Sequence, residues 1–348
     1  MRRKQRGVAL IIALVLVALA AILATKLTFD GWLERRRTIG VLAAEQAVHF
    51  GMGAEALAAD ALTQQTGQSD TLAQSWAQPQ QPMPLTPEND PEGEPIGALQ
   101  GSLEDMQGRF NLNNLGRVLQ PTATSQQSST QQSSTQSSTS TQTSTGGPDP
   151  QPLEQFQRLL VSVGLETKWA GIARDWITAT DVPSSPDGAK DAVYTAQSPP
   201  YRTGNYPMMS PSELMNMPGF GIDRYRKIAP YVTALPTATA AINICTASGP
   251  VLDSLLPESL SNEYSGNPDL LVAERKKGCF PETAAFTNIL NSVPGTAAKL
   301  SGRFAEKTAY FRLTTRVSLG TSEFTLYSLL YRSQGGKVTP LLRTFGTP

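Results

Sequence analysis

The sequence predicts an α+β protein in which a long N-terminal helix packs on an antiparallel sheet and further helices are inserted. Three observations in the 348-residue chain support this prediction. An uncharged apolar run covers residues 8–25, and apolar residues then recur at helical spacing as far as Leu62. Two shorter helical patterns lie within residues 152–179. Apolar and polar residues alternate over 309–317 and 323–331, which is typical of paired strands. The inserted helices therefore precede or interrupt the sheet.

The first element is a candidate membrane helix. The segment Met1–Arg6 carries four cationic side chains, and Gly7 separates it from the apolar run. A helix over residues 8–25 would be about 27 Å long, which matches the hydrocarbon thickness of a bilayer, and the cations would hold its N terminus in the cytoplasm. The alternative is a secretory signal peptide cleaved after the apolar core, among the small residues of Leu19–Ala24. The length of the run, and helix-forming sequence directly after Lys26, favour the retained helix.

The same helix continues as an amphipathic segment. Apolar residues from Leu27 to Leu62 keep helical spacing, with charged residues between them. Gly40, Gly51 and Gly53 weaken this part, so a kink or an early end near residue 50 is an open alternative. We therefore expect one helix over residues 8–63 that leaves the membrane and lies on another layer.

Composition excludes several functions. The formal net charge is zero and only 17% of the residues are charged, so there is no global electrostatic case for binding nucleic acid. The one histidine, His49, falls in the predicted surface helix, which argues against histidine-based catalysis or a zinc site. No nucleophile motif or phosphate-binding loop is present. The sequence thus predicts a protein that is not an enzyme.

Two cysteines, Cys245 and Cys279, follow an N terminus of the exported type. An oxidising compartment would favour a disulfide bond between them. The alternative is a pair of separate buried thiols, because the sequence does not show whether their side chains are close.

Shifts in composition divide the rest of the chain. Residues 78–97 are rich in proline and read as a loop, and residues 121–147 are almost entirely Ser, Thr and Gln, which cannot bury enough apolar surface to fold. The predicted divisions are a leader peptide 1–7, the helix 8–63, the first part of an α/β head 64–120, a Ser/Thr/Gln-rich disordered linker 121–150, an inserted α-helical domain 151–235, and the remainder of the head with C-terminal antiparallel strands 236–348.

A helix-hairpin-helix pattern lies in the inserted domain. Leu214–Ile222 contains the glycine hairpin, with Tyr225 and Ile228 behind it. In nucleic-acid-binding proteins the amides of such a hairpin contact phosphate, and Arg224, Arg226 and Lys227 could assist here. In a neutral, exported chain we expect the hairpin to be a packing unit that binds no nucleic acid.

Several segments together resemble the minor pseudopilin K proteins of type II secretion systems, the general secretion pathway protein K family. In order, they are Asp105–Leu115, with the pattern D-x-x-G-R-F-N-L-N-N-L; Ser198–Asn205; Ser212–Leu214; Pro230–Pro236; and Ile242–Ala247, in which Cys245 replaces the second Asn of I-N-V-N-T-A. With the leader, these segments extend from residue 7 to about residue 256. Each is weak alone, and their combination in this order is specific. Within the first segment, Arg109 is expected to hold a carboxylate, and Asp105 is the nearest candidate.

The resemblance implies a pseudopilin fold with a large inserted helical domain of SAM-like, helix-hairpin-helix-like type. It also implies that prepilin peptidase cuts after Gly7 and that the new N-terminal residue, Val8, is methylated. Members of the family usually carry Glu at the fifth mature position, which is Ile12 here. A buried carboxylate needs a partner, and the resemblance makes that partner the terminal amine of the preceding subunit. A subunit at a filament tip has no preceding subunit, which explains an apolar Ile12.

By this resemblance the chain would initiate or cap the periplasmic pseudopilus, with minor pseudopilins I and J, and also H, as partners. It would work with the inner-membrane secretion platform and support export of proteins across the outer membrane. Its location would be the bacterial inner membrane, with a cytoplasmic N terminus and a periplasmic head. The alternative function is a membrane-anchored periplasmic binding module that recognises secretion substrates.

The resemblance also raises the question of calcium. Some family members bind calcium through a D-x-D after a tryptophan and a downstream G-A-E-D. The equivalent positions here are Thr178, Thr180 and Lys190, so the expected acids are missing and a cation is added. Calcium requires six to eight oxygen ligands. Asp181, Asp187 and Asp191, with Asp175, could form a poorer site, and the alternative is a metal-free loop.

Overall fold

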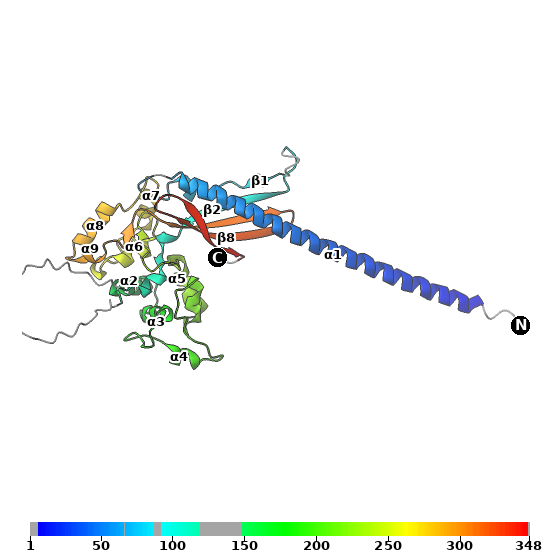
Figure 1. Cartoon of the computed structure of the whole chain (residues 1–348), viewed down its shortest axis with the longest axis horizontal. Coiled ribbons are helices and arrows are strands. Elements are labelled where there is room, and N and C mark those ends of the chain that lie inside the picture. Colours follow the sequence, from blue (N-terminus) through cyan, green and yellow to red (C-terminus); the bar gives the residue numbers. More distant parts are fainter. Residues whose placement is uncertain (1–5, 66, 87–91, 119–147, 347–348) are drawn as a thin grey trace, which may run out of the picture.

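The computed structural model describes residues 6–65, 67–86, 92–118 and 148–346 (Figure 1). Most of the predicted leader, and residues 121–147 of the predicted linker, lie outside the described residues.

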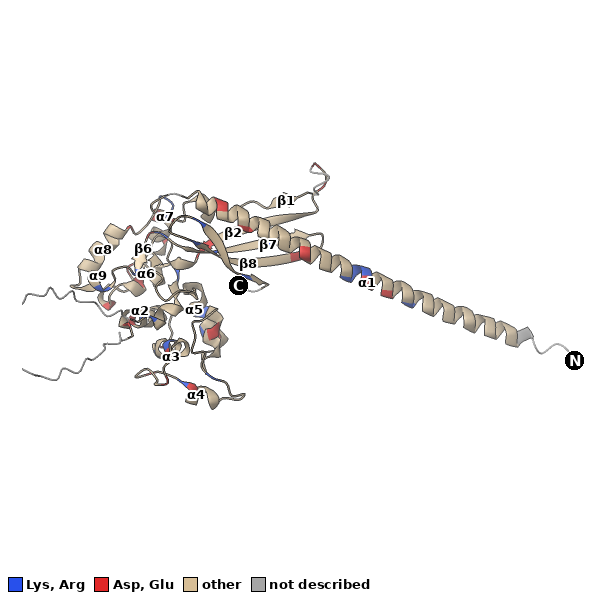
Figure 2. Cartoon of the chain, in the orientation of Figure 1, with Lys and Arg blue, Asp and Glu red and all other residues tan. Residues whose placement is uncertain are grey.

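The long N-terminal helix is confirmed. Helix α1 (Arg6–Thr63) runs without interruption for 58 residues and passes through all three glycines at which a kink or an early end was considered. Figure 1 shows that its N-terminal part projects away from the head, whereas its C-terminal part lies along the sheet. In Figure 2 the projecting end carries no charged residue over several turns.

Five antiparallel strands form the main sheet, which confirms the predicted C-terminal strands and adds two earlier ones. The order is β1 (Met83–Leu85), β2 (Gly97–Asp105), β7 (Tyr310–Leu319), β8 (Ser322–Arg332) and β9 (Val338–Phe345). Side chains along β7 alternate between buried and more exposed positions, as expected for a strand with one covered face. We call α1 together with these five strands the sheet layer.

Small side chains bring α1 close to the sheet. The helix buries Ala47, Ala54, Ala58 and Leu62 against it. At Gly51, an added Cβ would lie only 2.7 Å from Cδ2 of Leu326 on β8. The glycine that weakens the helix locally thus permits the close approach of helix and strand.

Polar contacts and an aromatic pair complete this interface. Glu55 on α1 is buried and accepts two parallel hydrogen bonds from Arg343 of β9, each 2.8 Å long, as well as one from Ser328 Oγ of β8. Such a bidentate pair fixes the direction of both groups. Beside the helix, Trp76 of the 3₁₀ turn η1 (Ser75–Ala77) packs edge-on against Phe311.

The second part of the head is the helical region, residues 148–305. Its helices are α2 (Pro150–Ser162), α3 (Lys168–Ile177), α4 (Asp191–Thr195), α5 (Gly221–Ile228), α6 (Gly249–Leu255), α7 (Pro268–Arg275), α8 (Thr283–Asn291) and α9 (Thr296–Lys299); its 3₁₀ turns are η4 (Pro211–Asn216), η5 (Ala229–Tyr231) and η6 (Glu258–Leu260). Helices α6 to α9 lie beyond residue 235, where the inserted domain was predicted to end. They share one apolar core with α2 and α3, so the helical packing continues to Leu300.

Two short parallel strand pairs connect distant segments. Strand β3 (Phe110–Asn111) pairs with β4 (Val232–Thr233), and β5 (Ile242–Asn243) pairs with β6 (Phe304–Ala305). The segment that carries β3 also forms the 3₁₀ turns η2 (Met106–Gly108) and η3 (Leu112–Gly116), and we call Met106–Arg117 the Asn-rich segment. It runs from the end of β2 into the core of the helical region.

Candidate functional site

The predicted processing residues lie in the first turns of α1. Gly7 and Val8 are adjacent there, and Ile12 follows about one turn later. The side chains of Val8 and Ile12 are 58% and 54% exposed, and apolar side chains stay exposed along the helix as far as Leu42. This helix is long and apolar enough to cross a membrane, and none of its most apolar stretch is buried in the protein.

From Val8 to Thr25 the helix carries no ionisable side chain. The first acidic residue of the chain is Asp30, about 27 Å along the helix from Ile12. An amine placed next to Ile12 would therefore find no carboxylate from this chain.

The Asn-rich segment joins the two parts of the head through side-chain amides. Asn113 is buried; its amide group donates to the carbonyl oxygens of Met208 (2.9 Å) and Leu235 (2.8 Å) and accepts from the amide of Met208 (2.7 Å). Asn111 accepts from the amide of Leu235 at 2.9 Å and donates to the carbonyl of Thr237 at 2.6 Å. The asparagines thus satisfy backbone groups that have no strand partner.

Asp105, at the end of β2, and Gln107, at the start of the Asn-rich segment, also bind buried polar groups. Asp105 accepts hydrogen bonds from Gln107 N, Asn243 Nδ2 and Thr246 Oγ1, each 2.7 Å long. Burial raises the pKa of this carboxyl group, and these hydrogen bonds oppose the rise. Gln107 spans the two parts of the head, since it donates to the carbonyl of Ala241 (2.7 Å) in the helical region and accepts from the amide of Ala309 (2.6 Å), directly before β7.

The partner of Arg109 differs from the one the sequence suggested. Asp105 was the nearest candidate, but Arg109 pairs with Glu104, which also binds Arg312 of β7 at 2.6 Å. The side chains of adjacent residues in a strand point to opposite faces, so Glu104 and Asp105 face different neighbours. Asp105 is turned towards Asn243 and Thr246 instead.

The predicted helix-hairpin-helix is a packing unit. Leu214, Met217 and Phe220 are buried, and Phe220 packs edge-on against Trp169 of α3. Arg224, one of the three cations close to the hairpin, forms two hydrogen bonds with Glu166. Its charge is therefore already paired.

Cys245 and Cys279 form a disulfide bond, with their Cα atoms 4.5 Å apart. The bond links the end of β5 to the loop before α8. The carboxylate of Glu306 lies within 4.8 Å of both sulfur atoms. This group is no metal site, because disulfide sulfurs are not the thiolates that bind metal.

The candidate calcium ligands do not converge. Asp181 and Asp187 are exposed, and Asp191 accepts hydrogen bonds from the amide (3.0 Å) and hydroxyl (2.6 Å) of Thr203. In the described ranges, no group of three acidic side chains brings its oxygens within 4.8 Å of one another. These residues therefore do not fit a calcium site, since calcium needs several carboxylate oxygens around one point.

A lysine occupies the centre of this loop instead. Lys190 is 6% exposed, and its ammonium donates to the carbonyl oxygens of Asp175 (2.6 Å) and Thr178 and to Oδ1 of Asn205 (3.3 Å). The Asp175 carboxylate is engaged separately by the amide and hydroxyl of Ser184. Burial lowers the pKa of the Lys190 ammonium, and the nearby carboxylates oppose that shift.

The fold and the helix define a class of protein. An exposed apolar helix of membrane-spanning length that continues onto an antiparallel sheet is the architecture of pilin-like filament subunits, here with a large helical region added. Residues 108–237 match the family model described as "Type II secretion system (T2SS), protein K".

Known proteins extend this match to the whole chain. The type II secretion system protein K of Pseudomonas aeruginosa is 31% identical over 99% of this chain and 94% of its own length, and that of Pectobacterium carotovorum is 30% identical over 99% and 98%. The chain belongs to the type II secretion system protein K family and is a minor pseudopilin. Its fold is similar to a chain in the crystal structure of the GspK-GspI-GspJ complex from enterotoxigenic Escherichia coli, with a TM-score of 0.68, 22% identity, and coverage of 90% of this chain and 100% of that one.

Proposed function

We propose that this minor pseudopilin sits at the tip of the type II secretion pseudopilus, where it initiates or caps assembly and so supports protein export. Ile12 is the observation that carries the proposal. A subunit within the shaft would need a carboxylate near this position to pair with the amine of the subunit before it. In this chain the surface around Ile12 is apolar, so it offers nothing to a preceding subunit.

The shape of the head supports the same position. The helical region lies at the end of the head that is far from the N terminus of α1 (Figure 1). A subunit stacked above would have to pass this bulk, whereas subunits below can pack along α1. The solved complex that resembles this chain contains GspK, GspI and GspJ, and we infer that minor pseudopilins I and J are partners here. Pseudopilin H joins them in this proposal.

Assembly begins with processing. We propose that prepilin peptidase cleaves between Gly7 and Val8, that Val8 is then methylated, and that the inner-membrane secretion platform extracts the helix. Before extraction, α1 spans the inner membrane with its N terminus in the cytoplasm and the head in the periplasm. Mass spectrometry of the purified protein tests the first step: Gly7→Ala should keep the leader, whereas Gly31→Ala, in an open part of the same helix, should be processed normally.

The tip position is tested by placing the subunit on assembled pseudopili. Immunogold labelling of a tagged head should mark one end of each filament, and labels spread along the shaft would contradict the proposal. Ile12→Glu adds a carboxylate that finds no amine, at a cost of up to about 3 kcal/mol in the bilayer, and should reduce secretion. Ile12→Leu is the matched control and should secrete normally.

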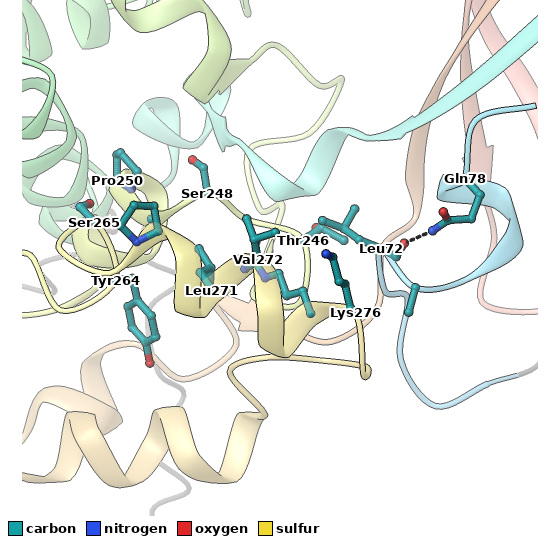
Figure 3. A pocket seen from close by; sticks show the side chains of 14 residues that line it. Leu72, Gln78, Thr246, Ser248, Pro250, Tyr264, Ser265, Leu271, Val272 and Lys276 are labelled. Carbon is teal, nitrogen blue, oxygen red and sulfur yellow. Dashed lines mark hydrogen bonds between the residues drawn. The ribbon is translucent and has the colours of Figure 1, made fainter.

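A second function, recognition of secretion substrates, is favoured by one cavity. It measures about 840 Å³ and lies between α7 and the segment that includes Leu72 and Gln78. Figure 3 shows Ser248 and Ser265 at one end and Lys276 nearer the other, with Leu271 and Val272 between them. The hydroxyls of Ser248 and Ser265 are buried and, within the described part of the chain, have no hydrogen-bond partner.

If an exported protein binds in this cavity, a charged side chain placed on the cavity wall should prevent the binding. Val272→Glu should then abolish copurification of exported proteins while pseudopilins I and J still copurify. Loss of I and J together with the exported proteins would mean that the cavity serves only the tip complex.

A further inference from the structure

The loop between α3 and η4 is organised around one buried cation. Lys190 reaches across it and contacts oxygens from two segments: the C-terminal end of α3, through Asp175 and the following Thr178, and the later part of the loop, through Asn205. Thr178 also presents its hydroxyl oxygen, 3.5 Å from the ammonium. All of these partners are oxygen atoms, and two of them are backbone carbonyls.

The backbone around the ammonium is arranged to present those oxygens. Asn205 has a positive φ of 48°, a conformation that asparagine tolerates better than most residues, and its amide donates to the carbonyl of Trp176 at 2.8 Å. At Gly188 an added Cβ would collide with the Asp175 carboxylate and with Ser184. The loop therefore passes too close to Asp175 for any side chain at that position.

A divalent cation uses the same chemistry. Backbone carbonyls, side-chain amide oxygens and hydroxyl oxygens on loops are the neutral ligands of calcium sites. An ammonium offers three donors to such oxygens but only one charge, and it is tethered to the chain. The carboxylates that a calcium ion would need are absent or engaged elsewhere, as Asp191 is by Thr203.

We propose that the Lys190 ammonium is a built-in replacement for a metal ion, which holds residues 178–205 in one conformation without calcium. The conformation of the loop is then fixed by a side chain of the protein itself, so it does not depend on the calcium concentration around the head. This inference does not depend on the tip position.

Hydrogen exchange of the full-length protein in detergent tests the proposal. Four loop amides have acceptors within this unit and serve as reporters: Ser184, Gly188, Thr203 and Asn205. Amides of β8 report global folding. The wild type should show the same protection of the loop amides in EDTA and in 1 mM calcium chloride. Calcium-dependent protection of the wild type would overturn the proposal.

A substitution at Lys190 and a control at an exposed lysine test the role of the ammonium group separately from the packing of its side-chain stem. Lys190→Met should reduce protection of the loop amides at least tenfold, in EDTA and in calcium alike, whereas the exposed Lys227→Met should leave it unchanged. Unchanged protection in Lys190→Met would overturn the proposal. If this variant also loses protection in β8, it is globally unfolded. The proposal is then tested by the protection of the wild-type loop amides in EDTA and in calcium chloride.

The reverse substitution tests whether the oxygens form a cation site. Thr178→Asp combined with Lys190→Glu replaces the ammonium by two carboxylates. Its loop amides should be unprotected in EDTA and regain protection in calcium chloride, but not in magnesium chloride, which demands tighter octahedral geometry. If calcium restores no protection, the oxygens around Lys190 are not a cation site and the proposal fails.

Discussion

In the sheet layer, backbone groups of different segments pair with one another along continuous ladders, whereas in the helical region the segments between helices are joined largely by side chains that bind backbone groups. Strands β7 and β8 stay in register over ten consecutive residue pairs. In contrast, β3, β4, β5 and β6 have two residues each, and the backbone near them is bound by Asn111, Asn113 and Gln107. The connections of the helical region therefore depend on particular polar side chains, whereas the sheet layer depends on alternating apolar residues and a regular backbone ladder.

The largest expected effect concerns the disulfide bond, which ties two parts of the helical region. Cys245 and Cys279 are 34 residues apart, and a loop of this length corresponds to about 4 kcal/mol of lost chain entropy in the unfolded state. The double variant Cys245→Ala, Cys279→Ala should lose that much free energy of unfolding in urea titrations in detergent.

The control for this prediction is chemical. Wild type treated with reductant should unfold at the same urea concentration as the double variant. A double variant as stable as the oxidised wild type would show that the helical region does not need the covalent link.

The next effect tests the asparagine side chains. Asn113→Ala removes three hydrogen bonds and leaves backbone groups of Met208 and Leu235 unpaired in the core. At about 1 kcal/mol or more for each buried group, we expect a loss of about 3 kcal/mol. Asn291→Ala, at an exposed helix end, should change stability by less than about 0.5 kcal/mol. Equal effects of the two substitutions would show that the hydrogen bonds of Asn113 do not stabilise the helical region.

The smallest change in stability is expected in the sheet layer, where a substitution in α1 alters only the packing of helix and sheet. Gly51→Leu should destabilise the protein by about 2 kcal/mol, because the new side chain meets Leu326. Gly53→Leu, where no atom lies within 4 Å of an added Cβ, should stabilise it by about 0.5 kcal/mol through helix propensity. Circular dichroism during urea unfolding gives both values. Destabilisation by Gly53→Leu would show that α1 packs on the sheet through a different face.

The same contrast explains what the sequence could predict. Alternation predicted β7 and β8 to within a few residues, and helical spacing predicted α1 because its pattern is long and regular. The segments that form α6 to α9 were assigned to the rest of the head, because the sequence of a short helix does not indicate which layer of the protein it packs against. Their bounds follow from packing against α2 and α3.

Some residues of the candidate site could be predicted from the sequence and others could not. Local signals place Gly7, Val8 and Ile12 together on one helix. The position of Lys190 depends on carbonyl oxygens of Asp175 and Thr178, and a carbonyl is common to every residue, so no sequence pattern reveals it. The pairing of Arg109 with Glu104 was missed for a related reason: strand direction, not sequence distance, decides the partner.

The uninterrupted α1 also has a mechanical consequence. Its 58 residues form a rod about 87 Å long, and its far end is clamped to the sheet by the pair of Glu55 and Arg343. A tilt of about 10° at the N-terminal end would displace Glu55, about 74 Å along the helix, by roughly 13 Å, as calculated from that helical rise. The helix thus acts as a lever, and the orientation of the whole head reports the angle at which its first turns are held.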